Sequence, residues 1–71
     1  MKKPTLAIAR RMIKKANPGI TGLEISWSHK PMLCPQHDGG QFYSSVVNVS
    51  ATGYRSKKQV LTVDPDGTWI R

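Results

Sequence analysis

The apolar residues of this chain change their spacing at one point, and that change limits the fold more than any other feature of the sequence. From Leu6 to Ala16 they recur at helical spacing, in a run without Gly or Pro. Asn17-Pro18-Gly19 then ends the helix, because Pro18 disfavours helical geometry at Asn17 and Gly19 accepts a left-handed turn. Beyond this break the apolar residues alternate with polar ones, which is typical of half-buried β-strands. The sequence therefore predicts one N-terminal helix followed by strands.

Three segments carry this alternation or the residue types that favour strands. Leu23 to His29 predicts a half-buried strand, Phe42 to Ala51 the central strand, and Ser56 to Val63 a third strand. The segment from Lys30 to Gly40 contains two Pro and two Gly, and we expect it to be a long connection. Leu23, Ile25 and Trp27 share one face of the first strand. In the second strand Tyr43, Val47, Val49 and Ala51 nearly share one face, and Phe42 and Val46 lie on the other. The inward side of the third strand is expected to carry Leu61 and Val63.

Two segments that favour turns separate the predicted strands. Thr52-Gly53 is expected to turn the chain between the second and third strands. Asp64-Pro65-Asp66-Gly67 is a stronger signal, since Pro fits the second turn position and Gly the position that needs a positive φ. A short fourth strand, Thr68 to Ile70, would then form a hairpin with the third.

The expected fold class is α+β. An N-terminal amphipathic helix packs on a three- to four-stranded antiparallel β-meander, which gives a two-layer sandwich. At this length, residues 1–71 are expected to form a single small basic domain. Trp27 and Trp69 are the largest apolar groups, and in so small a core we expect them to anchor the sheet. A Trp69 exposed near Arg71 would instead indicate a binding role.

The charge of the chain is strongly positive and unevenly distributed. Eleven Lys and Arg against four Asp and Glu give a net charge of +7, and six of the basic residues lie within the first fifteen positions. Such a field favours polyanions, which include nucleic acid, an acidic protein surface and anionic lipid. The outer arc of the predicted helix is cationic throughout, so it is either a phosphate-contacting surface or a solvated face that keeps the chain soluble. Its members are Arg10, Arg11, Lys14 and Lys15.

A second basic cluster lies at the start of the third predicted strand. It consists of Tyr54, Arg55, Lys57 and Lys58. An aromatic ring beside cations is the composition expected where a base or sugar stacks next to phosphate contacts. The alternative is an edge strand that lysines protect from aggregation. The sequence leaves open whether the two clusters share one face.

The middle of the chain resembles double-stranded-RNA-binding domains, in which a strand, a Gly-containing turn and a Ser-Lys-Lys run precede the last helix. The matching residues are Phe42, Val47, Val49, Gly53, Ser56, Lys57 and Lys58. The chain departs from that family afterwards, because Gln59 to Val63 favours a strand and Asp64-Pro65-Asp66-Gly67 breaks the chain where the family has its helix. The resemblance covers about a quarter of the chain, and we do not assign the chain to the family.

Residues with metal-binding or nucleophilic side chains gather between His29 and Asp38. Cys34 and His37 have the two-residue gap of zinc-ligand pairs, but a structural zinc site usually needs two such pairs. Catalysis through Cys34 would need a histidine oriented by a third group, and the sequence shows none. No paired carboxylates occupy a predicted site, and no Gly-rich loop joins a strand to a helix for phosphate binding. We therefore expect no metal, no cofactor and no enzymatic activity.

The expected compartment is the cytoplasm, and no membrane partner is expected. A single cysteine excludes an intramolecular disulfide, and cations interrupt the N-terminal segment from Met1 to Lys15 where a signal peptide needs an apolar run. The leading functional prediction is a small binding protein that acts through its basic helix face, either by binding nucleic acid, DNA or RNA, or as a regulatory protein. The alternative is a protein–protein interaction module or inhibitor, an accessory factor that binds an acidic protein or pairs through a sheet edge. Oligomeric state stays open.

Overall fold

The N-terminal helix forms where the sequence predicts it, and side chains fix both of its ends. In the computed structural model, which describes residues 2–71, α1 spans Leu6–Ala16. The Thr5 hydroxyl accepts a hydrogen bond from the Ile8 backbone N at 3.3 Å, which caps the first turn. At the other end the backbone N and the Nδ2 of Asn17 donate to the Ile13 carbonyl at 3.0 and 2.9 Å. Met1, the first residue of the segment compared with a signal peptide, lies outside the described residues.

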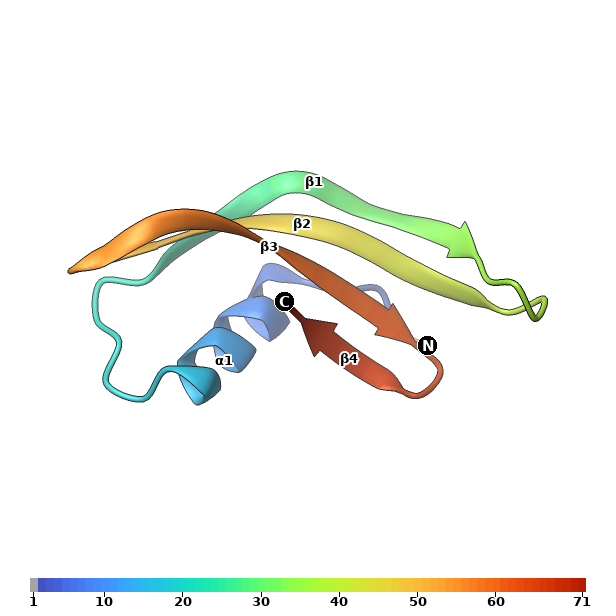
Figure 1. The fold of residues 1–71 in the computed structure, drawn as a ribbon, viewed down its shortest axis with the longest axis horizontal. Coiled ribbons are helices and arrows are strands. Elements are labelled where there is room, and N and C mark those ends of the chain that lie inside the picture. The colour runs from blue at the N-terminus through green and yellow to red at the C-terminus, as the bar shows by residue number, and fades with distance from the viewer. Residues whose placement is uncertain (1) are drawn as a thin grey trace.

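Four antiparallel strands follow in the order β1-β2-β3-β4, each paired with the next along the chain. Their bounds are β1 Glu24–Pro35, β2 Gln41–Ala51, β3 Tyr54–Asp64 and β4 Gly67–Ile70. Figure 1 shows the sheet curving over α1, so the helix covers one face, which we call the inner face. The opposite, outer face carries no helix of the described chain. The predicted α+β fold, one helix on an antiparallel meander, is confirmed.

The prediction of a long connection from Lys30 to Gly40 is wrong for its first half, because β1 continues to Pro35. β1 is an edge strand, and an edge tolerates proline, whose missing N–H can face away from the neighbouring strand. Two shifts of register, one on either side of His29, also adapt β1 to β2. The true connection is a short turn in which Gln36 N donates to the Gly40 carbonyl at 2.8 Å.

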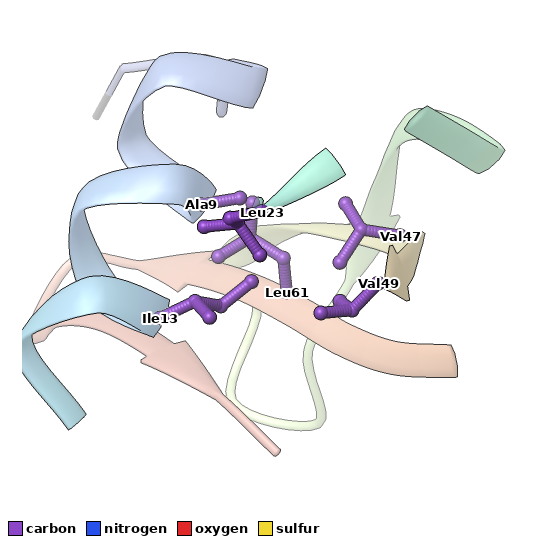
Figure 2. Close-up of a cluster of buried hydrophobic side chains, with 6 residues drawn as sticks. All are labelled: Ala9, Ile13, Leu23, Val47, Val49 and Leu61. Atoms are coloured by element: carbon purple, nitrogen blue, oxygen red, sulfur yellow. The ribbon is translucent and has the colours of Figure 1, made fainter. Parts of the chain in front are cut away.

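The core lies between α1 and the inner face of the sheet. Figure 2 shows Ala9 and Ile13 of α1 facing Leu61 of β3 and the two valines of β2, Val47 and Val49. These side chains are almost completely buried. The predicted inward side of β3 is confirmed, since Leu61 and Val63 are buried. The residues that share a face of the other two strands are also buried or packed against this cluster, namely Leu23, Ile25, Trp27, Val47, Val49 and Ala51.

Trp69 does not anchor the core, contrary to the prediction. Its neighbour Ile70 packs against the core cluster, so alternation along β4 directs Trp69 to the outer face. The side chain is 52% exposed. Its Nε1 donates to the Asp64 carboxylate at 3.1 Å, which ties the ring to the β3–β4 turn.

The segment between α1 and β1 is tied to the turn between β2 and β3. Thr52 N donates to the Thr21 carbonyl at 3.0 Å. Gly22 lies against Thr52 with a φ of +63°, and a Cβ on Gly22 would collide with the Thr52 hydroxyl. This contact holds the start of β1 against the end of β2.

β3 runs to Asp64 and is followed by a β-hairpin, so no helix occupies the position of the last helix of double-stranded-RNA-binding domains. In residues 2–71 there is also no helix that is both long enough and apolar enough to cross a membrane.

Candidate nucleic-acid interface

The cationic arc of α1 is solvent-exposed, as Arg10, Arg11, Lys14 and Lys15 all lie on the surface. Arg10 differs from the others because its Nη1 donates to the Leu23 carbonyl at 3.0 Å. That bond fixes the guanidinium at the entrance to β1. Lys14 and Lys15 occupy the last helical turn, where the helix dipole favours positive charge by about 0.3–1 kcal/mol each.

The second cluster lies at the turn between β2 and β3, which Figure 1 shows projecting beyond α1. Tyr54 is half-buried against the core, whereas Arg55, Lys57 and Lys58 are exposed. The Lys57 Nζ lies 5.1 Å from the centroid of the Tyr54 ring, a cation–π contact that orients the lysine. The ring is therefore partly covered by the core and by Lys57, which reduces the surface that Tyr54 offers to a base.

The structure brings part of the helix cluster together with part of the strand cluster. Arg10, Lys57 and Lys58 line one hollow of about 830 Å³, which we call the basic hollow. The apolar part of its lining is Leu6, Leu23, Ile25 and Val49. Two segments far apart in the sequence thus supply cations to one hollow: Lys57 lies on the α1 side of β3 with its partner Val49, and Lys58 lies on the outer side with its partner Asn48.

The remaining residues of the helix cluster do not share this hollow. Arg11 lines a separate hollow of about 490 Å³, together with Met12 and the β3–β4 turn. Lys14 and Lys15 line neither hollow. Of the four helix cations, Arg10 therefore lines the basic hollow and Arg11 the second hollow.

Two of the acidic residues, Asp64 and Asp38, accept backbone hydrogen bonds within turns. The Asp64 carboxylate accepts hydrogen bonds from Asp66 N at 2.9 Å and Gly67 N at 3.0 Å, in addition to Trp69 Nε1. Asp38 accepts from Gly40 N at 3.2 Å. Glu24 is the acidic residue of the basic hollow, and it is exposed. The hollow therefore contains three cations and one carboxylate.

Sequence reasoning missed the polar side chains of this region. Ser26, Asn48, Ser50 and Ser56 also line the basic hollow. Asn48 Nδ2 donates to Ser26 Oγ at 3.2 Å across β1 and β2. The signal was present in the sequence, because these residues alternate with the inner-face residues of their strands. What the sequence did not contain was their proximity to Arg10.

The residues considered for a metal site do not converge. His29 lies on β1 opposite Val46, whereas His37 lies in the exposed turn after β1. Cys34 is half-buried and its thiol donates to the Met32 carbonyl at 3.6 Å. Across residues 2–71 no group of three or more His, Cys, Asp or Glu is placed to hold a metal ion.

The comparison of this chain with known proteins gives no relatives from which a function could be transferred. No family model, curated protein or solved structure matches it.

Proposed function

We propose that this chain is a small, non-enzymatic cytoplasmic protein that binds nucleic acid, and that the basic hollow is the centre of its binding surface. The observation that carries the proposal is the convergence of Arg10, Lys57 and Lys58 on one hollow from two distant segments. The cytoplasm suits a chain whose one cysteine is free.

The chemistry of the hollow suits a phosphate with its attached sugar or base. A guanidinium has five N–H donors, so the single bond from Arg10 to Leu23 orients the group and leaves donors for phosphate oxygens. Lys57 and Lys58 add two ammonium groups. Serine hydroxyls and apolar side chains of the same lining can contact sugar and base.

The other cations have a supporting role in the proposal. Arg11, Lys14, Lys15 and Arg55 are exposed around the molecule, and the net charge is +7. Such a field raises the rate of association with a polyanion and adds sequence-independent affinity. An acidic protein would be attracted by the same field, and it is the alternative that the binding experiment must separate from nucleic acid.

The test is a fluorescence-anisotropy titration of labelled single-stranded and duplex DNA and RNA at two salt concentrations. We expect affinity to fall as salt rises, with a slope of about −0.9 in log–log form per phosphate contacted on duplex DNA and about −0.7 on single strands. Lys58→Ala should weaken binding to all sequences alike and reduce the slope by about one contact. Lys30→Ala, an exposed lysine outside both clusters, is the matched control and should have a smaller effect.

Two results would contradict the proposal. The first is the absence of binding to every nucleic acid tested at low salt. The second is binding that Lys30→Ala and Lys58→Ala weaken equally, since this would assign the interaction to overall charge rather than to the basic hollow. Capture of an acidic protein after nuclease treatment, together with the first result, would favour the alternative.

A further inference from the structure

The outer face of the sheet carries a group of large apolar side chains that the monomer leaves in solvent. Met32 is 66% exposed, Val60 43% and Trp69 52%. The half-buried Phe42 and Val46 lie on the same face, because they alternate along β2 with residues of the inner face. We call these five residues the outer patch: Met32, Phe42, Val46, Val60 and Trp69.

The strand pairing spreads the outer patch over the whole sheet, with the polar residues Ser44 and Thr62 between Met32 and Trp69. Val46 of β2 is paired with Val60 of β3, and Thr62 of β3 is paired with Trp69 of β4. Met32 of β1 is paired with Ser44, which in turn is paired with Thr62. The patch therefore crosses all four strands of the sheet.

The charges next to the outer patch differ from those of the rest of the molecule. Asp64 and Arg71 lie on either side of Trp69 along the strand direction, since Asp64 pairs with Gly67 and Arg71 exchanges backbone hydrogen bonds with Val60. Their charges are opposite. These two charges balance each other within a chain of net charge +7, and Lys58, two residues before Val60 on the same side of β3, adds one positive charge at the border of the outer patch.

We propose that the outer patch is the interface of a homodimer, in which two copies of this chain pack their sheets face to face. Two sheets packed in this way lie about 10 Å apart, with their apolar side chains interdigitated. Homodimer interfaces are more apolar than the average protein surface, and Trp is one of the residue types enriched where binding energy is concentrated.

Charge favours a second copy as the occupant. A twofold axis across the strands, at the level of Thr62 and Trp69, exchanges the levels of Asp64 and Arg71. Arg71 of each copy then meets Asp64 of the other copy, so the pairing is complementary. Because α1 lies on the opposite face of the sheet, its cations point away from the second copy and the repulsion between two basic chains is kept low.

The test is sedimentation velocity of the purified chain over a dilution series, after nuclease treatment and in high salt so that nucleic acid cannot bridge two copies. We expect the mass of two chains at high concentration. Trp69→Ser should weaken dimerisation by about tenfold or more, as expected for the loss of a buried Trp at an interface centre. Val60→Lys provides a second variant, since it introduces a charge within the outer patch.

Leu33→Ser is the matched control. Leu33 is 45% exposed and neighbours Met32, but it is paired with Tyr43 and belongs to the inner side of β1. The control should dimerise like the natural chain, and circular dichroism should show that each variant is folded. A monomer at every concentration would overturn the proposal. A dimer that the Trp69 and Val60 variants leave intact, or that Leu33→Ser weakens equally, would also overturn it, because another surface would then be responsible.

Discussion

The two faces of the sheet are formed by the same strands, but their side chains differ in burial in the monomer. On the inner face, Val47 and Leu61 are fully buried under α1. On the outer face, their neighbours Val46 and Val60 are half-buried and 43% exposed, respectively. Since alternate residues of one strand differ this much, the folding energy of the monomer is concentrated on one face. The apolar residues of the outer face therefore need an explanation other than folding.

Neighbouring residues of β3 test this difference most strongly. We expect Leu61→Ala to reduce the free energy of unfolding by about 2–5 kcal/mol, because it leaves a cavity under α1. Val60→Ala should cost less than about 1 kcal/mol, since much of its side chain already contacts water. Urea denaturation at a concentration where the chain is monomeric gives both values. Similar losses for the two variants would contradict the distinction between the faces.

The contact between Gly22 and Thr52 supports the inner face at the entrance to β1. We expect Gly22→Ala to destabilise the fold by about 1–3 kcal/mol, because the new Cβ meets the Thr52 hydroxyl at a positive φ. Gly19→Ala is the control, since Gly19 also has a positive φ but nothing lies near its Cβ position. Thermal unfolding should therefore show a larger loss for the Gly22 variant. Equal losses would mean that backbone strain alone is responsible.

A pair of serines on β2 extends the comparison to polar groups. Ser45 is buried on the inner face, and its hydroxyl donates to the Leu61 carbonyl at 2.9 Å. We expect Ser45→Ala to cost about 1 kcal/mol in the free energy of unfolding, the usual net value of such a bond. Ser44→Ala, on the outer face, should change stability by less than about 0.5 kcal/mol. Chemical denaturation of the two variants side by side tests whether burial decides the effect.

The sequence predicts the parts of the fold that depend on local signals. The bounds of α1 follow from helical spacing and from the Asn17-Pro18-Gly19 stop, and the buried positions of β2 and β3 follow from alternation. Lys30 to Pro35 is predicted as part of a connection and not as a strand, because proline argues against a strand unless the strand is known to lie at an edge. Edge position is a property of the whole sheet.

Predicting the candidate sites requires the tertiary structure more than predicting the helix and strands does. The exposure of Trp69 is set by the register of β4 on β3, and a strand of four residues has too short a pattern to reveal which face is buried. The sequence shows that Arg10, Lys57 and Lys58 are basic. That they line one hollow depends on how α1 packs against the sheet. The outer patch likewise appears only when the four strands are placed side by side.

The central functional proposal is tested most directly by backbone amide shifts of the isotope-labelled chain during titration with single-stranded and duplex oligonucleotides. The proposal predicts shifts concentrated around Arg10, Lys57 and Lys58, which diminish as salt is raised. The residues of the outer patch should shift less, since none of them lines the basic hollow. Shifts that are absent with every oligonucleotide, or that centre on the outer patch instead of the basic hollow, would contradict it.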